Sequence, residues 1–397
     1  MNYIERNLSA SLWNRASPKA MLISGARSVG KTALLERFVD RTEAAWYTGD
    51  RYADVERLKL LSEGDVLTLL FQSDTLVIEE AQRIPEIGLL LKRLVAANKT
   101  LPTPVRLFVT ASASLDWAPG VKESTVGYVV DHELWPLSLT ELAHAAEYDW
   151  PGVRRHLDLR IVYGMLPAAV DEPQKARNIL RNYVEGRLLM DLRLFGGIRL
   201  RSKLEDLLHV LAHRVGTEVS YDALARVTGL NKMIIADYIA LLEQCFVIKV
   251  CPSFARNLPN ELKKGKKIYF CDNGVRNALL NRFEPLSARE DRDALWENFF
   301  YMERVKLHSQ RRDDCRIHFW RTAGKKPRSL DFIEVEDGVM RAFECRLSSK
   351  ARAEVDSVFQ EAYPECPVQV ITPAASLKKW AEAKPQKRPS ENANAPF

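Results

Sequence analysis

The chain has 397 residues, of which 46% are apolar and 28% are charged, so it can bury two or three hydrophobic cores. The net charge of +6 is modest, no run of about 18 apolar residues could span a bilayer, and the N-terminal residues lack the apolar region of a signal peptide. The sequence therefore predicts a cytoplasmic protein. None of the six cysteines has the spacing of a zinc ligand, and we expect reduced thiols and no structural zinc.

The first strong pattern is an apolar run at residues 20–24 that leads into a glycine-rich loop. The run predicts a buried parallel strand, and apolar residues at helical spacing after the loop predict a helix. Between them lies the pattern G-x-x-x-x-G-K-[ST], which predicts a nucleotide-triphosphate site, the alternative being an ordinary glycine turn. The loop consists of Gly25, Ala26, Arg27, Ser28, Val29, Gly30, Lys31 and Thr32.

This loop has the chemistry that a triphosphate requires. Gly25 and Gly30 allow backbone N–H groups to approach phosphate oxygens closely. Lys31 would contact the β- and γ-phosphates, and the hydroxyl of Thr32 would bind Mg²⁺. We therefore expect ATP and Mg²⁺ as the ligands.

A second apolar run, residues 75–78, ends in two acidic residues. Glu79 would lie in the Mg²⁺ shell, where Asp is usual, and its extra methylene is expected to weaken metal binding. Glu80 would be the base that polarises the attacking water. The structural alternative is that both acids only cap the end of a strand.

A third strand is predicted at residues 105–112, and it ends in hydroxyl side chains. Thr110 or Ser112 could contact the γ-phosphate there. Hydroxyl residues at strand ends are, however, more often simple turn formers.

Four segments together resemble successive motifs of a bacterial and archaeal AAA-type ATPase family. They are the loop at residues 25–32, Glu-Glu-Ala-Gln-Arg-Ile-Pro-Glu at 79–86, Val-Thr-Ala-Ser at 109–112 and Leu-Trp-Pro-Leu-Ser at 134–138. The resemblance covers nearly residues 1–375. It implies an ATPase core, a winged-helix region and a C-terminal domain of unknown function that is similar to PD-(D/E)xK restriction nucleases.

Residues 204–250 fit the winged-helix region of that order. Apolar residues at helical spacing are interrupted by Gly216 and Gly229 and are followed by a strand-like run, which predicts a helix-turn-helix with a wing. Asn231 and Lys232 at the start of the second helix would contact bases or phosphates if this helix entered a major groove. The helix has few basic residues, so a role in packing or in regulation of the ATPase is an equal alternative.

A cluster of basic residues follows the predicted wing. A hairpin here could lie on nucleic-acid phosphates, and a solvated basic loop is the equal alternative. After it, Asp272 is expected to cap a helix. The basic residues are Arg256, Lys263, Lys264, Lys266 and Lys267, with Glu261 among them.

The C-terminal part has most of the residues that the resemblance to nucleases requires. Glu297 lies on a predicted helix, Asp331 opens a predicted strand, and Glu344 lies in the next one. The resembling nucleases end this motif in acid-x-Lys, whereas Arg346 takes the place of the lysine here. A guanidinium cannot share a proton and binds phosphate as a fork, so we expect binding or a structural role rather than cleavage.

Two further departures from the family pattern concern the ATPase. Tyr128 stands where many relatives have an arginine that could act across a subunit boundary, which weakens the expectation of a homo-oligomer. Met190 occupies a place where relatives often have an arginine before Asp191, and Arg187 or Arg193 could substitute. Together with Glu79, these departures favour ATP binding over fast turnover.

The predicted fold is α/β, with a P-loop NTPase parallel sheet, then a winged-helix domain and a restriction-endonuclease-like α/β domain. We expect the ATPase domain at 1–155, the helical and winged-helix domain at 156–275, the nuclease-like domain at 276–375 and a disordered basic tail at 376–397. The leading interpretation is a Mg²⁺-dependent ATPase that acts as a nucleotide-controlled switch on double-stranded DNA or a protein partner. The alternatives are an ATP-driven, metal-dependent DNA nuclease and a binding module that keeps nucleotide only for stability.

Overall fold

The computed structural model describes residues 3–8, 17–59, 61–114, 127–145, 150–194, 201–254, 265–322, 328–347 and 357–374. These residues form two compact units. The N-terminal unit comprises Glu5–Trp135 and Gln244–Phe246, and the C-terminal unit is built mainly from Pro136–Glu243 and Val247–Pro385. The basic residues expected at 256, 263 and 264 and the tail from 376 onward lie outside the described residues.

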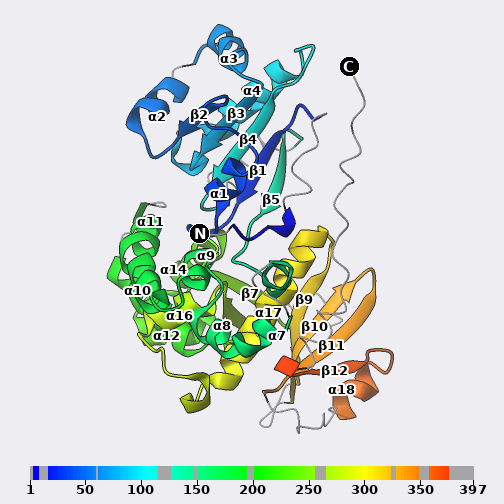
Figure 1. Cartoon of the computed structure of the whole chain (residues 1–397). Helices are drawn as coiled ribbons and strands as arrows, with labels where there is room; N and C mark the ends of the chain where they lie inside the picture. Colours follow the sequence, from blue (N-terminus) through cyan, green and yellow to red (C-terminus); the bar gives the residue numbers. More distant parts are fainter. Residues whose placement is uncertain are drawn as a thin grey trace. The chain divides into compact units, whose positions relative to one another are not determined.

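The N-terminal unit is built around a five-stranded parallel sheet with the strand order β2-β3-β4-β1-β5 (Figure 1). The strands β1, β3 and β4 are buried almost throughout, as their continuous apolar sequences predict for a parallel sheet. The strands are β1 (Ala20–Ser24), β2 (Ala45–Thr48), β3 (Thr75–Glu79), β4 (Arg106–Ala111) and β5 (Val129–Glu133). The helices are α1 (Lys31–Glu36), α2 (Tyr52–Lys59), α3 (Glu63–Leu70) and α4 (Ile87–Asn98), with a short 3₁₀ turn, η2 (Ala81–Arg83).

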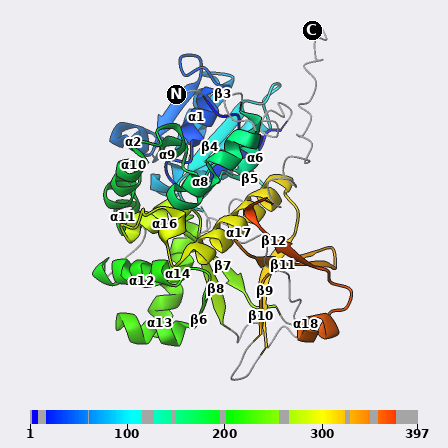
Figure 2. The same ribbon diagram turned by 60° about the horizontal axis from the view of Figure 1, so that its bottom comes forward.

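The first part of the C-terminal unit consists of helices that lie beside a small antiparallel sheet of order β6-β8-β7 (Figure 2). Its first helices are α6 (Leu139–His144), α7 (Trp150–Arg155), α8 (Leu157–Tyr163), α9 (Pro167–Asp171), α10 (Ala176–Tyr183), the π-helical segment η4 (Val184–Leu188) and α11 (Leu189–Leu194). The following elements are α12 (Arg201–His213), β6 (Glu218–Val219), α13 (Tyr221–Thr228), α14 (Lys232–Gln244), β7 (Ile248–Pro252), β8 (Lys266–Phe270) and α16 (Asn273–Leu279). Asp272 caps α16, as expected, because its carboxylate accepts a hydrogen bond from the N–H of Val275.

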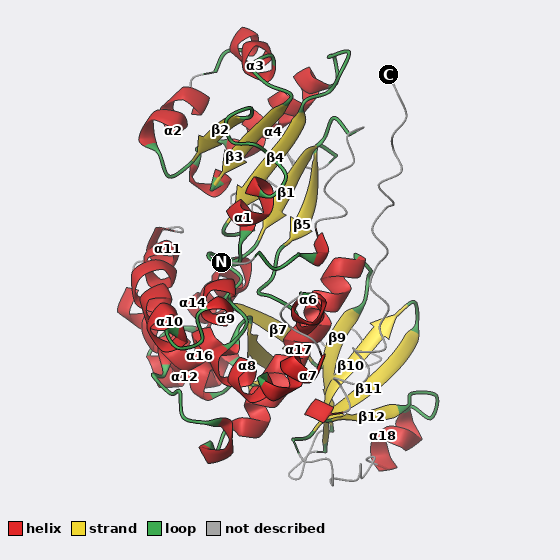
Figure 3. Ribbon diagram, in the orientation of Figure 1, coloured by secondary structure: helices red, strands yellow, loops and turns green. Residues whose placement is uncertain are grey.

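The remainder of the C-terminal unit is a four-stranded mixed sheet of order β12-β11-β10-β9 with two helices, α17 and α18 (Figure 3). β7 is joined to β9 by a parallel bridge between Ser253 and Phe319, so the two sheets of this unit meet. The long helix α17 is buried over much of its circumference, including Trp296 and Phe300. The elements are η5 (Leu286–Ala288), α17 (Arg292–Arg311), β9 (Arg316–Arg321), β10 (Ser329–Glu336), β11 (Val339–Cys345), α18 (Ser357–Ala362) and β12 (Val368–Ile371).

The helices α6 and α7 belong to the C-terminal unit, in which the helical part and the four-stranded sheet form one compact body. Within the part of the chain that the structure describes, no helix combines the length and apolar character needed to cross a lipid bilayer.

Candidate nucleotide-binding site

The glycine-rich loop joins the end of β1 to the start of α1, at the carboxyl edge of the parallel sheet. A Cβ atom at Gly25 would lie 2.1 Å from the backbone oxygen of Leu134, so only glycine fits there. Gly30 has φ +97° and immediately precedes α1, a left-handed conformation that other residues rarely adopt. The two glycines of the motif are thus required by the shape of the loop itself.

Lys31 folds back over this loop and is almost completely buried. Its Nζ atom donates hydrogen bonds to the backbone oxygens of Gly25 (2.7 Å) and Ala26 (2.9 Å) and to the hydroxyl of Ser112 (3.1 Å). Three donors on an ammonium group are matched here by three oxygen acceptors. A phosphate group would compete directly with these acceptors for the same proton donors.

Thr32 and Glu79 are in direct contact, since the Thr32 hydroxyl donates a short hydrogen bond to Oε1 of the carboxylate. The other carboxylate oxygen, Oε2, accepts hydrogen bonds from Trp46 Nε1 (2.8 Å) and from Arg41 (3.3 Å). The guanidinium of Arg41 also lies over the ring of Trp46, 4.6 Å from its centroid. One oxygen of Glu79 is therefore held by the protein, while the other faces the hydroxyl of the loop.

Glu80 is held by four side chains and lies between β3 and η2. Its carboxylate accepts hydrogen bonds from Ser112 (2.7 Å), Gln82 (2.8 Å) and Arg27 (3.1 Å), the last of which is also an ion pair. The backbone N–H of Glu80 donates to the Thr110 hydroxyl at 3.3 Å. Both hydroxyl residues predicted at the end of β4 therefore contact Glu80. Thr110 contacts the backbone N–H of Glu80, and Ser112 contacts its carboxylate.

The environment of Glu80 is strongly electropositive. Burial alone would raise the pKa of this carboxyl, but the charges of Lys31 and Arg27 and the hydrogen bonds from Ser112 and Gln82 lower the pKa below its ordinary value. The residue also has φ +49°, in the left-handed region that is uncommon for a residue with a side chain. Such conformations cluster at functional sites, where surrounding contacts maintain them.

Several contacts at this site could not be predicted from any motif in the sequence. The buried side chain of Arg6 donates hydrogen bonds to the backbone oxygens of Val29 (2.7 Å) and Trp135 (2.6 Å). It therefore ties the glycine-rich loop to the segment that follows β5. Arg41 and Trp46 lie on a turn and a neighbouring strand with no motif around them. Ser112 and Gln82, by contrast, lie within segments that the family resemblance covers.

The residues expected to form a nuclease-like site meet in part. Oε1 of Glu297, on α17, accepts hydrogen bonds from Lys267 Nζ (2.8 Å) and from the hydroxyl of Tyr269 (2.6 Å), both on β8. Lys267 Nζ also lies 3.6 Å from Oδ1 of Asp331 on β10, whose Oδ2 accepts from the backbone N–H of Cys345. Lys267 belongs to the basic cluster for which the sequence left open a phosphate-binding hairpin or a solvated loop. In the structure it is 7% exposed and bridges the two acids.

The single ammonium of this cluster is shared by two carboxylates. Burial alone would lower the pKa of Lys267, but the charges of Glu297 and Asp331 raise it above its ordinary value. Burial raises the pKa of Glu297, which Lys267 opposes and Asp331 reinforces. Lys267 therefore remains an ammonium ion between its two partners at neutral pH.

The remaining predicted residues of this part have local partners. Glu344 forms an ion pair with Arg346, the residue that takes the place of the expected lysine. Asn231 caps α14 by accepting a hydrogen bond from the N–H of Ile234 at 2.9 Å, which is a structural role. Lys232 pairs with Asp222 at 2.8 Å on the surface, and Lys266 donates to the hydroxyl of Tyr221.

Three family models match successive parts of the sequence. Residues 17–143 match an AAA domain, residues 154–286 match a domain of unknown function (DUF8612), and residues 292–388 match a second domain of unknown function (DUF4143). No curated protein matches the sequence at a significant level.

Solved structures with a similar fold include a Walker-type ATPase of Pyrococcus abyssi (PABY2304). It has a TM-score of 0.50 and 15% identity, and the similarity covers 70% of this chain and 96% of that chain. Lower scores are found for a replication initiator DnaA bound to AMPPCP and single-stranded DNA (0.27; 15% identity; 61% and 90% covered) and for a mutant RuvB of Thermotoga maritima (0.27; 17% identity; 58% and 81% covered). At such identities the similarity concerns the fold alone. The chain thus carries an AAA-type ATPase domain, followed by two domains of unknown function.

Proposed function

We propose that this protein binds ATP with Mg²⁺ and hydrolyses it slowly, and that it acts as a nucleotide-controlled switch on a partner. The observation that carries the proposal is the convergence of two contacts at one edge of the parallel sheet. Ser112 links Lys31 to Glu80, and the hydroxyl of Thr32 contacts Glu79. The AAA domain at residues 17–143 supports the choice of nucleotide.

The donor set fits the expected ligands. Thr32 and one oxygen of Glu79 are hard oxygen ligands in direct contact, as a Mg²⁺ ion bound beside phosphates requires. Bound there, Mg²⁺ would neutralise phosphate charge during phosphoryl transfer. The backbone of residues 25–30 would hold the phosphates. Thr110, whose hydroxyl accepts a hydrogen bond from the N–H of Glu80, would lie next to the γ-phosphate.

We assign Glu80 as the base that orients and activates the attacking water. The carboxylate accepts hydrogen bonds from Arg27, Ser112 and Gln82 in this structure. A γ-phosphate would draw Lys31 away from Ser112, because the two compete for the same ammonium protons. Ser112 and Arg27 would then rearrange, and this would release the carboxylate toward the water.

The partner is proposed to be double-stranded DNA or a protein, bound by the regions that follow the ATPase domain. The order α12-β6-α13-α14-β7-β8, with a sheet of order β6-β8-β7, supports a winged-helix arrangement within residues 156–275. Asn231, Lys232, Lys266 and Lys267 all have intramolecular partners. This favours a regulatory or protein-binding use of the region over direct reading of bases.

A second candidate function is metal-dependent cleavage of DNA by residues 276–375, which would be nuclease-like. One observation favours it: Lys267 places an ammonium beside Glu297 and Asp331, supplying the lysine that Arg346 replaces. The same ammonium occupies the space between the two carboxylates that a divalent cation would need. Asp331→Ala should abolish any Mg²⁺- or Mn²⁺-dependent cleavage, and the candidate fails if the wild type never cuts DNA.

The main proposal is tested by ATP hydrolysis with Mg²⁺, measured for the wild type and Lys31→Ala, each with and without double-stranded DNA. Activity that requires Lys31 supports the ATPase, and stimulation by DNA identifies DNA as the partner. ATP binding without turnover would support a nucleotide-binding switch and would contradict the proposal that the protein hydrolyses ATP. An absence of ATP binding by the wild type would contradict the whole proposal.

A further inference from the structure

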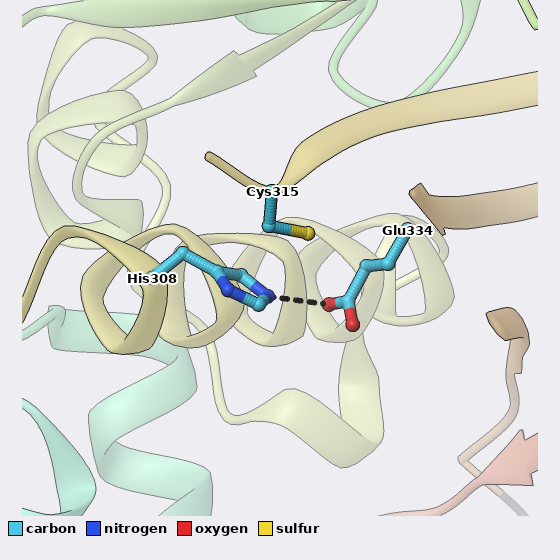
Figure 4. Close-up of side chains that lie close together, drawn as sticks. All are labelled: His308, Cys315 and Glu334. Atoms are coloured by element: carbon cyan, nitrogen blue, oxygen red, sulfur yellow. Dashed lines mark ion pairs between the residues drawn. The ribbon is translucent and has the colours of Figure 1, made fainter. Parts of the chain in front are cut away.

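A group of three metal-ligand side chains lies in the C-terminal unit, and none of the three belongs to the clusters described above. His308 lies in the last turn of α17, Cys315 lies in the segment between α17 and β9, and Glu334 lies in β10. One ligand atom from each, a ring nitrogen, the sulfur and a carboxylate oxygen, lies within 4.8 Å of the other two. Figure 4 shows the three side chains pointing toward a common space.

We propose that His308, Cys315 and Glu334 form a binding site for one Zn²⁺ ion, or for a transition metal of similar preference. Nitrogen, thiolate and carboxylate ligands in one set suit Zn²⁺, whereas Mg²⁺ and Ca²⁺ select oxygen ligands. With bonds of about 2.0 Å to nitrogen and about 2.3 Å to sulfur, neighbouring ligands of tetrahedral Zn²⁺ lie about 3.5 Å apart. The His308 Nε2 to Glu334 Oε1 distance is 3.3 Å, close to this spacing, and the Cys315 sulfur lies within 4.8 Å of both ligand atoms.

The surroundings of His308 orient its ring for this role. Both carboxylate oxygens of Asp313 lie 2.9 Å from Nδ1, on the opposite side of the ring from Glu334. Burial lowers the pKa of His308, but its contacts with Cys315, Glu334 and Asp313 raise the pKa to about 10, so a metal at Nε2 would have to displace a proton. Asp313 would then keep the Nδ1 proton, which is the usual outer-shell arrangement at zinc sites. Asp313 also accepts a hydrogen bond from the backbone N–H of Cys315 at 3.3 Å, so the same side chain positions two of the three ligands.

Glu334 is fixed in the same manner from its other side. Arg304 donates to its two oxygens at 2.5 and 2.7 Å, a bidentate contact that holds the carboxylate plane. The positive charges of Arg304 and Arg341, which both pair with Glu334, oppose metal binding, but the thiolate and the carboxylates of Asp313 and Glu334 outnumber them once the His308 ring is neutral. A dication would therefore relieve an excess of negative charge once the thiol is deprotonated.

Access to the site is provided by Cys315. It is partly exposed, whereas the other five cysteines are buried. With three protein ligands, a fourth position remains for water or a further ligand, as at zinc sites that are not closed. The spacing of His308 and Cys315 matches no zinc motif, which is why the sequence predicted no structural zinc.

The test is direct binding of Co²⁺, a spectroscopic substitute for Zn²⁺, and of Zn²⁺ itself to the full-length reduced protein. We expect one ion per chain, a thiolate-to-cobalt charge-transfer band, and displacement of Co²⁺ by Zn²⁺. Cys315→Ala should remove the band. Asp313→Asn should keep the band but weaken binding by about 10- to 100-fold, because only the orientation of His308 is lost.

Cys366→Ala is the matched control, because Cys366 is a buried thiol in the core of the same sheet. It should bind Co²⁺ as the wild type does. A second measurement uses only the wild type, so it does not depend on the folding of any variant. Zn²⁺ should slow the alkylation of Cys315, measured by mass spectrometry, by at least about 10-fold. It should not slow the alkylation of an unfolded peptide that contains cysteine. The proposal is overturned if Co²⁺ gives no charge-transfer band, if the band survives in folded Cys315→Ala, or if Zn²⁺ leaves the alkylation of Cys315 unchanged.

Discussion

The hydroxyl of Ser112 donates to Oε1 of Glu80 at 2.7 Å and lies 3.1 Å from Nζ of Lys31. One hydroxyl thus connects the lysine of the phosphate loop to the acid at the end of β3. A ligand that displaces Lys31 from Ser112 must alter the hydrogen bonding of Glu80. This relationship is the basis on which we propose that phosphate binding is coupled to the release of Glu80.

Glu80→Gln should bind ATP as tightly as the wild type but hydrolyse it about 100-fold or more slowly, because a positioned base contributes about 10²–10⁴ to the rate. Single-turnover hydrolysis and equilibrium ATP binding check this. Glu56→Gln, on the exposed side of α2, is the control and should leave both unchanged. Equal turnover by Glu80→Gln and the wild type would remove Glu80 from the mechanism.

Arg27→Ala should shift the acid limb of the pH–rate profile to higher pH. In the wild type, burial opposes ionisation of Glu80, and Lys31 and Arg27 lower its pKa despite that burial. Removal of one of these positive charges must therefore raise the pKa, so that the base becomes protonated at a higher pH. Arg37→Ala, on the segment after α1, is the control. A limb that stays in place or moves to lower pH contradicts the assignment.

Lys267→Met should destabilise the protein by about 3–5 kcal/mol, because Glu297 and Asp331 would be left without their shared ammonium. Lys266→Met, the neighbouring residue on β8, should cost about 1 kcal/mol or less, since its ion is more exposed. Urea unfolding of the two variants at neutral pH makes the comparison. Similar losses in both would show that the buried bridge has no special role in stability.

The pH dependence of stability should include a contribution from Asp291, which pairs with Arg276 and Arg289. Burial opposes the shift, but hydrogen bonds from Arg289 and the charge of Arg276 lower the pKa of Asp291 from 3.8 to about 2. The folded pKa is thus below the unfolded one, so this contribution is complete above about pH 4 and is lost as the pH falls toward 2.

Asp291→Asn tests this contribution. The difference in unfolding free energy between wild type and variant should shrink by about 1 kcal/mol between pH 5 and pH 2.5, after allowance for solvent screening of a half-buried group. Denaturant unfolding at the two pH values measures it. A difference that is the same at both values would show that the pKa of Asp291 is not lowered.

The phosphate loop and the two acids of the site could be predicted from the sequence because short, continuous segments of the chain determine their geometry. The loop between Gly25 and Thr32 joins consecutive elements, and the apolar run before Glu79 predicts a buried strand that ends beside it. Parallel strands bring their carboxyl ends to one edge of the sheet, which places the loop beside the acids.

The contacts that the sequence could not predict depend on long-range packing. Arg6 reaches Val29 and Trp135 from a segment without any motif, and the position of Arg41 against Trp46 depends on how a turn meets β2. The largest difference between the expectation from the sequence and the structure concerns Lys267. Its neighbours in sequence are basic, which predicts exposure, but β8 is covered by α17 and β10, which supply the compensating acids.

The most direct measurement is equilibrium binding of ATP with Mg²⁺ to the wild type, Lys31→Ala and Lys59→Ala. We predict that Lys31→Ala loses about 100-fold or more in affinity, because the phosphates lose a buried charged donor, while Lys59→Ala, altered on the surface of α2, binds as the wild type does. Equal affinity of all three proteins for ATP, or no binding by any of them, would contradict the assignment of this loop as the nucleotide site.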